Sequence, residues 1–307
     1  MTGGEQAARE RSARADALRG ILLMLCSMSA IAVLDAIAKL LSHRLPGVQV
    51  TWGYFTCILL ALTVYAALRG RSIFGLLRSR RPVLQILRAA ALVGSLSLLF
   101  TGLAYLPLAE ATTISFTSPL FVVALSGPLL GERVGLHRWG AVIVGLLGAV
   151  IVMRPGSEMF QPAALFPLFG AVFFAFFQIV TRRLGNADDP ITTIAWTAGG
   201  GALILTPVMP FVWMTPVAPE LAIFVGMGAL GLVAHLCLVG AFALGDASML
   251  APFNYVRILW AIALGVVLFG DWPDVGTLVG GAVIVASGLY VLVRESRAGH
   301  PPPQHRP

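Results

Sequence analysis

Charged side chains are scarce in this chain. Asp, Glu, Lys and Arg together make up 11% of its 307 residues, against about 25% in an ordinary soluble domain. The mean hydropathy is +0.87. Such a composition excludes an ordinary soluble globular protein and predicts a protein that crosses a membrane several times.

Cysteine and the signatures of common enzymes are also lacking. The only cysteines are Cys26, Cys57 and Cys237, which lie in separate apolar segments without paired spacing. We interpret them as buried thiols that pack as small hydrophobic side chains. The motifs of P-loop nucleotide sites, zinc proteases and serine hydrolases are missing. We therefore predict no metal or other cofactor, no ATP-driven pumping by this chain and no familiar hydrolysis.

Acidic residues are fewer than basic ones, 14 against 21, which gives a net charge of +7. The basic residues lie in tails, short loops or apolar segments, and no soluble domain presents them to a nucleic acid. We therefore predict no nucleic-acid partner. The distribution of this charge instead indicates how the chain is oriented in a bilayer.

Apolar windows of the length needed to span a bilayer, about 20 residues, recur along nearly the whole sequence. We predict ten spans, at 19–40, 48–68, 82–104, 110–130, 137–153, 163–181, 191–212, 220–243, 248–269 and 274–293. Uninterrupted apolar runs such as 165–177 exclude the strict alternation of a transmembrane β-barrel. The predicted fold class is therefore an all-α membrane protein with ten transmembrane helices.

Basic residues outside these spans, or at their cytoplasmic ends, are unevenly distributed. If the N-terminus is cytoplasmic, 16 Lys and Arg residues fall on the cytoplasmic side and two, Arg44 and Arg154, on the outer side. The positive-inside rule then places both termini in the cytoplasm. We predict that the polar segments 1–17 and 296–307 are disordered tails, and that the first span is too long to be a cleaved signal peptide.

The string GAVIV occurs twice, at residues 140–144 and 281–285. Each copy follows a pair made of a glycine and an acid, Gly131-Glu132 in the first case and Gly270-Asp271 in the second. Small residues recur at four-residue spacing around both copies, as close helix packing in lipid requires. We interpret the repeated string as the mark of an internal duplication.

Two repeated halves, 18–155 and 156–295, would each contain five spans. Because five is odd, the second half must enter the membrane from the opposite side, so the halves are inverted. Inverted halves suit alternating access, since exchanging their conformations turns an inward-open protein into an outward-open one.

Further similarity between the halves lies just before the glycine–acid pairs. The run AYLPLAEATTISFTSPLF (104–121) leads to GER (131–133), and AFALGDASMLAPFNYVRILWA (241–261) leads to FGD (269–271). With these segments the chain resembles the drug/metabolite transporter superfamily, specifically its EamA-type ten-helix members, from about 18 to 294. The resemblance implies a multi-pass inner-membrane carrier, often an exporter of amino acids or related compounds, with spans 1, 3, 4, 6, 8 and 9 around a central cavity.

Arg257 is the strongest candidate for substrate binding. It lies about ten residues into a predicted span, hence about 15 Å deep. A charge at that depth needs a cavity or a partner. We predict that it binds or gates an anionic group, with Asn254 and Tyr255 within one turn, and an internal ion pair remains the alternative.

Other polar residues in the spans are weaker candidates. Asp35 and Lys39 share one helical face, so they either neutralise each other or Asp35 couples transport to protons. Arg88 and His235 are candidates for substrate binding, although Arg88 could snorkel to the interface and His235 could be a hydrogen-bonded interior side chain.

Prolines interrupt two corresponding spans. Pro119 frees the carbonyl group of Ser115, and Pro252 frees that of Ser248, because proline has no N–H to donate. Freed carbonyls at that depth either line a binding cavity or accompany a simple kink.

The function predicted from these features is a secondary transporter, with export the expected direction, of a small metabolite such as an amino acid or another carboxylate. Its partners would be this substrate, the lipid bilayer and coupling protons, and the chain would be a monomer or a weak homodimer. A passive channel and a membrane enzyme acting on lipid-linked substrates are the alternatives. Saturable counterflow would separate a carrier from a channel, and product formation would identify an enzyme.

Overall fold

The structure is a computed structural model that describes residues 3–70, 72–131, 134–157, 160–185, 187–245 and 247–297. Within these residues every regular element is a helix, and ten helical segments are long and apolar enough to cross a membrane. The predicted all-α fold with ten spans is therefore confirmed.

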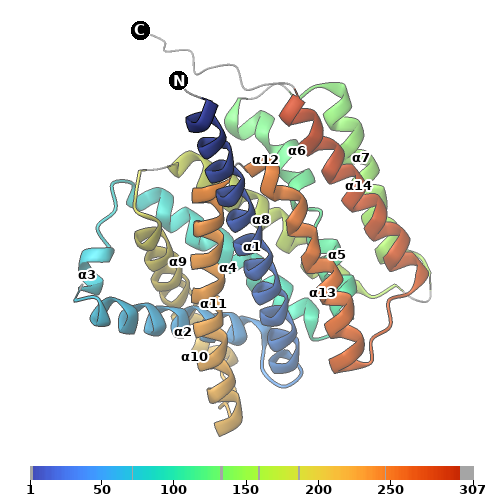
Figure 1. The fold of residues 1–307 in the computed structure, drawn as a ribbon. Coiled ribbons are helices and arrows are strands. Elements are labelled where there is room, and N and C mark those ends of the chain that lie inside the picture. Colours follow the sequence, from blue (N-terminus) through green and yellow to red (C-terminus); the bar gives the residue numbers. More distant parts are fainter. Residues whose placement is uncertain are drawn as a thin grey trace.

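The first five spans are built from six helices. These are α1 (Gly3–Ser42), α2 (Gly47–Leu68), α4 (Pro82–Leu103), α5 (Leu108–Ser115) with α6 (Ser118–Leu130), and α7 (Leu136–Met153). The short helix α3 (Ile73–Leu76) lies in the loop between α2 and α4. Figure 1 shows that the first turns of α1 and the last turns of α14 lie at the same end of the bundle.

The second five spans repeat this order. They comprise α8 (Leu165–Leu184), α9 (Pro190–Leu205), α11 (Ala218–Leu244), α12 (Ala247–Leu250) with α13 (Val256–Leu264), and α14 (Val275–Arg297). The short elements are η1 (Pro162–Ala164), η2 (Thr206–Val208), α10 (Met209–Val212), the 3₁₀ turn η3 (Ala251–Tyr255) and the π-helical turn η4 (Gly265–Phe269). Helix α8 therefore corresponds to α1, α9 to α2, α11 to α4 and α14 to α7.

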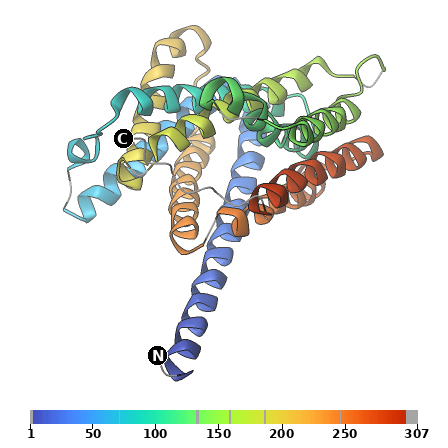
Figure 2. The same ribbon diagram turned by 90° about the horizontal axis from the view of Figure 1, so that it is seen from above.

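The N-terminal segment differs from the expectation. Helix α1 begins at Gly3, so the chain is helical through most of the segment that the sequence predicts to be a disordered tail. Figure 2 shows these first turns projecting beyond the other helices. Of the predicted C-terminal tail, 296–307, the first two residues belong to α14, and residues from 298 onward lie outside the described residues.

The fourth and ninth spans are both interrupted. In the fourth, α5 stops at Ser115 and α6 starts at Ser118 with Pro119 in its first turn. In the ninth, Pro252 lies in the 3₁₀ turn that separates α12 from α13. Both spans then end on a glycine, Gly131 or Gly270, with a φ of 71°, a left-handed conformation that glycine adopts without steric cost.

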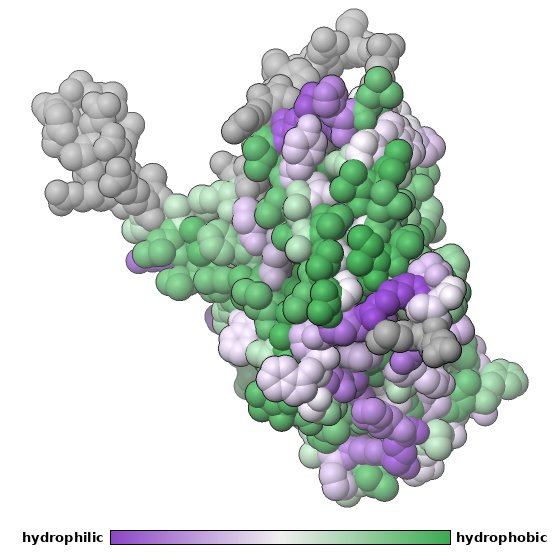
Figure 3. All heavy atoms as spheres, turned by 90° about the vertical axis from the view of Figure 1, so that its right-hand side faces the viewer, coloured by the Kyte–Doolittle hydropathy of each residue, from purple (hydrophilic) through white to green (hydrophobic). Residues whose placement is uncertain are grey.

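The two GAVIV copies lie on α7 and α14, which pack against each other along their lengths. A Cβ atom added to Gly280 would lie 2.5 Å from the carbonyl oxygen of Gly148. The absence of side chains at these two positions allows the backbones to touch, and such small-residue contacts replace the hydrophobic effect as the basis of helix packing in lipid. The outer side of this pair carries a broad hydrophobic band (Figure 3), as contact with lipid requires.

Candidate functional site

Asp35 and Arg257 form an ion pair inside the helical bundle. The Nε atom of Arg257, on α13, donates a hydrogen bond to Oδ2 of Asp35, on α1, at 2.7 Å, and a second guanidinium nitrogen lies 2.7 Å from the same oxygen. The Asp35 side chain is 5% exposed and that of Arg257 17%. The pair thus joins the first half of the chain to the second at a buried position.

Lys39 has a different partner from the one that its spacing suggests. Its Nζ atom lies 2.8 Å from a carboxylate oxygen of Asp271 and donates to the carbonyl oxygen of Leu106 at 2.6 Å. The ammonium also lies 5.1 Å from the ring centroid of Phe269. The suggested pair between Asp35 and Lys39 is therefore wrong, because each side chain binds a partner from the second half that is more than 200 residues away.

The interrupted spans meet next to the ion pair. The ring of Phe116, at the break between α5 and α6, lies 5.2 Å from that of Tyr255, at the end of η3. The Tyr255 hydroxyl packs so closely on Gly288 that an added Cβ would approach it to 2.2 Å. Asn254 and Tyr255 are both half-buried and lie on the 3₁₀ turn that ends two residues before Arg257. Helix interruptions in transporters occur where backbone groups line a substrate path.

Comparison with known proteins places this geometry in a family. The model of the EamA-like transporter family matches residues 18–154 and 161–294, which is most of the chain. The chain belongs to the EamA-like transporter family. As a family member it is a transporter of small metabolites and not an enzyme, and the family model matches the chain twice.

Named relatives transport several kinds of metabolite. The chain is 29% identical to an S-adenosylmethionine uptake transporter of Rickettsia conorii, with 92% of this chain and 95% of that protein covered. It is 28% identical to a riboflavin transporter of Vibrio cholerae, with 91% and 95% covered. It is 27% identical to the pseudopaline exporter CntI of Pseudomonas aeruginosa, with 87% and 94% covered.

A solved structure supports the fold of this EamA-like transporter. One crystal structure, described only as that of a protein, aligns with a TM-score of 0.59 at 22% identity over 94% of this chain and 99% of the other. At that identity the likeness concerns the fold alone.

Arg88 lies in a second polar cluster, apart from the Asp35–Arg257 pair. From α4 its Nε donates to the Thr181 hydroxyl at 2.8 Å, and another guanidinium nitrogen donates to the Thr197 hydroxyl and, at 3.3 Å, to the Thr193 carbonyl. The guanidinium carbon lies 4.5 Å from the ring centroid of Phe177. Arg88 is only 8% exposed, so it points into the bundle rather than snorkelling to the interface.

A loop carboxylate lies at the edge of this second cluster. Asp188 accepts hydrogen bonds from the Ser79 hydroxyl, from the backbone N–H of Arg80 at 2.8 Å and from the Gln85 amide at 2.9 Å. Desolvation raises the pKa of Asp188, but the hydrogen bonds outweigh it and hold the pKa below the usual value for aspartate. Asp188 therefore stays ionised at neutral pH and ties the loop before α9 to the start of α4.

The remaining predicted residues make local contacts. Nδ1 of His235 lies 2.8 Å from the carbonyl oxygen of Gly231, one turn earlier on α11, as expected for an interior histidine. The Ser115 hydroxyl donates to the Ala111 carbonyl at 2.9 Å. The backbone of Ser248 lies in α12, but its side chain is outside the described part of the chain.

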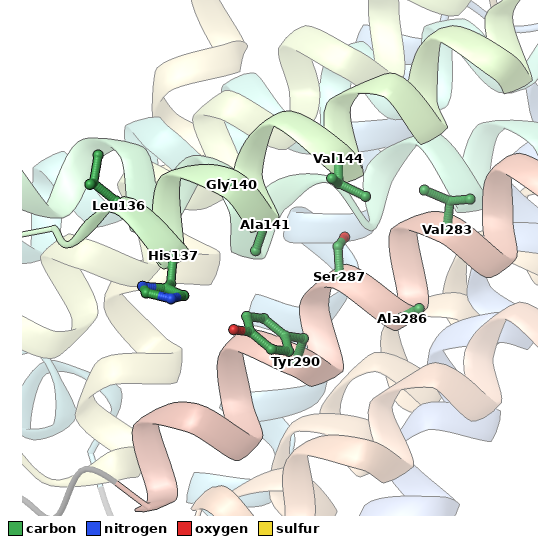
Figure 4. Close-up of a pocket in the computed structure, with 9 residues that line it drawn as sticks. All are labelled: Leu136, His137, Gly140, Ala141, Val144, Val283, Ala286, Ser287 and Tyr290. Atoms are coloured by element: carbon green, nitrogen blue, oxygen red, sulfur yellow. The ribbon is translucent and has the colours of Figure 1, made fainter.

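A groove of about 640 Å³ lies between α7 and α14, away from all these polar residues. Figure 4 shows its lining side chains, which come from the two helices that carry the GAVIV strings. These side chains are mostly apolar, and the groove opens on the hydrophobic face of the bundle. We therefore do not place the substrate there.

The sequence does not identify Tyr54 and Gln85, and it marks Asp271 only as part of a repeated glycine–acid pair. Asp271 pairs with Lys39, Tyr54 lies within electrostatic range of both Asp35 and Arg257, and Gln85 binds Asp188. Only contacts between distant helices reveal these three roles. A polar residue one or two turns from a span boundary is the sole local signal.

Proposed function

We propose that this protein is a secondary transporter that moves a metabolite bearing an α-amino acid group by alternating access between two inverted halves. The observation that carries the proposal is the buried Asp35–Arg257 pair next to the two interrupted spans. The guanidinium can bind a carboxylate with two parallel hydrogen bonds, and the Asp35 carboxylate can bind an ammonium group.

A zwitterion can replace this ion pair without leaving a buried charge uncompensated. Removing one partner of a buried pair costs about 3–5 kcal/mol. A ligand with a carboxylate alone would occupy Arg257 and leave the buried Asp35 carboxylate without a positive partner, at that cost. An amino acid group supplies both opposite charges at once. The site thereby favours zwitterions over simple carboxylates.

One of the named relatives is consistent with such a substrate. S-adenosylmethionine, named for the Rickettsia conorii relative, carries an α-amino acid group, which makes it the first probe to test. Export remains the direction expected from the family resemblance, whereas that relative is named for uptake. Because a secondary transporter follows the gradients imposed on it, flux should be measured both ways.

Counterflow in proteoliposomes tests the proposal. Vesicles containing the purified protein and loaded with S-adenosylmethionine or methionine should take up labelled methionine faster than empty vesicles, and the rate should saturate. Vesicles loaded with riboflavin or with methioninamide should show no such stimulation. A linear, unstimulated flux would indicate a channel, and equal stimulation by riboflavin would contradict recognition of an amino acid group.

Orientation is the second testable part of this proposal. With both termini in the cytoplasm, a cysteine in place of Ser157 lies outside and a cysteine in place of Gly75 lies inside, and both positions are exposed. In a background without Cys26, Cys57 and Cys237, an impermeant maleimide applied to intact cells should label the first variant and spare the second. The opposite labelling pattern would reverse the orientation.

A further inference from the structure

Most helix contacts occur twice, once in each half. Helix α1 packs on α11 as α8 packs on α4, α1 packs on α13 as α8 packs on α6, and α2 packs on α11 as α9 packs on α4. A contact found in both halves of one structure cannot depend on which side of the protein is open. These helix pairs therefore stay in contact in both the inward-open and the outward-open state.

Side chains follow the same repeat. Lys39 lies seven residues before Pro46, and Arg183 lies seven residues before Pro190, the prolines at the starts of α2 and α9. Lys39 binds Asp271 just after the ninth span, and Arg183 donates to the carbonyl of Leu129 at the end of the fourth. Arg183 thus occupies the position in α8 that Lys39 occupies in α1.

The most extensive contacts without a counterpart are those of α1 and α2 with α4. Helices α1 and α2 also pack on α4, whereas among the described residues α8 and α9 make at most marginal contact with α11. Gly47, at the start of α2, lies against α4 so closely that an added Cβ would be 2.4 Å from the Thr101 backbone nitrogen. At the same end of the bundle Lys39, besides its ion pair with Asp271, donates a hydrogen bond to the carbonyl oxygen of Leu106, in the loop that follows α4.

This asymmetry identifies a gate. In an inverted repeat, the contacts that one half makes in one state are made by the other half in the opposite state. We infer that Arg183 is the counterpart of Lys39 in a two-sided gate. In the opposite state Lys39 releases the Leu106 carbonyl, and Arg183 donates to the carbonyls of Ala243 and Leu244 at the end of α11.

The chemistry of both ends suits this exchange. The last carbonyls of a helix have no intrahelical N–H partner and carry the negative end of the helix dipole, so they accept hydrogen bonds from a cation. Arg183 lies exposed in the last turn of α8 and already donates to one carbonyl. It can therefore bind a second acceptor as α11 approaches, just as Lys39 binds both Asp271 and Leu106.

The inference rests on the alternating access proposed above, but its test needs no substrate. Spin labels at His43 and Tyr105 report the end that is closed in this structure, and labels at Ala187 and Phe242 report the other end. Distances are measured by pulsed electron resonance on the full chain in lipid nanodiscs. Lys39→Met should lengthen the distance between the labels at His43 and Tyr105. It should also increase about tenfold the population in which the labels at Ala187 and Phe242 lie close together, since a hydrogen bond to a charged group is lost.

Arg183→Met should have the opposite effect. The population with a short distance between the labels at Ala187 and Phe242 should fall about tenfold, whereas Arg182→Met, which removes the same charge one residue earlier, should leave it unchanged. An unchanged population in Arg183→Met, or an equal loss in both variants, would overturn the assignment of Arg183. The absence of that short distance from both the wild type and Lys39→Met would overturn the gate itself. If these distance changes are observed but methionine counterflow fails, the proposed substrate is contradicted and the gate is not.

Discussion

Arg257→Gln should abolish the preference of the purified protein for methionine over methioninamide. In the wild type the guanidinium can bind the methionine carboxylate, and the amide leaves this buried charge without an anionic partner. A charged, bidentate interaction is worth about 1.5–3 kcal/mol, so the wild type should prefer methionine by about 10- to 100-fold. The Arg257→Gln variant should bind both ligands about equally well. Titration of both ligands by thermal stabilisation measures the ratio.

The controls separate binding from folding. Arg257→Lys should restore only part of the preference, because an ammonium group cannot offer the planar fork of a guanidinium. Arg294→Gln removes an exposed arginine from α14, whose side chain donates to the Tyr290 hydroxyl, and should retain the full preference. Loss of the monodisperse size-exclusion peak in Arg257→Gln, or an equal loss of affinity for both ligands, would mean that Arg257 only holds the helices together.

Span number and the duplication are predictable from the sequence because both leave strong local signals. Each span is an apolar window of the required length, and the GAVIV strings with their preceding glycines mark equivalent positions. The interruptions of the fourth and ninth spans have a local cause as well, since proline disrupts the helix in which it lies. No contact between distant segments is needed to see any of these features.

Ion-pair partners are not predictable in this way. Asp35 and Lys39 lie one turn apart, so helix geometry alone favours pairing between them. The actual partners, Arg257 and Asp271, are brought to opposite ends of this stretch of α1 by the packing of the ninth span on the first. That packing depends on the shapes of many side chains, and a single sequence does not show it.

A similar limit applies to Arg88. Its position in the sequence places it near the end of a span, where a long side chain can reach the interface. Three acceptors and an aromatic ring, all from α8 and α9, instead hold it inside the bundle. The deciding residues are threonines, which are common in membrane helices and so give no signal of their own.

The same ion pair makes Asp35 the residue through which protons could drive transport. Asp35 can hold a proton or a salt bridge to Arg257 but not both, because protonation removes the negative charge that binds the guanidinium. A substrate carboxylate that binds Arg257 would release Asp35 for an ammonium group or for a proton. Proton binding and substrate binding would then be linked through one charged pair.

Asp35→Asn should therefore abolish accumulation driven by a pH gradient while exchange of methionine across the membrane remains measurable. One pH unit can support an accumulation ratio of about tenfold per coupled proton, and the variant should reach a ratio of about one. Because asparagine leaves Arg257 without an anionic partner, the double variant Asp35→Asn with Arg257→Gln controls for misfolding. Asp189→Asn is the matched control, since the Asp189 side chain caps α9 by accepting a hydrogen bond from the Ile191 N–H and has no part in the pair or the gate, and it should keep gradient-driven accumulation. Labelled methionine uptake into proteoliposomes with an imposed pH difference measures all four proteins, and accumulation retained by Asp35→Asn would rule out Asp35 as the coupling residue.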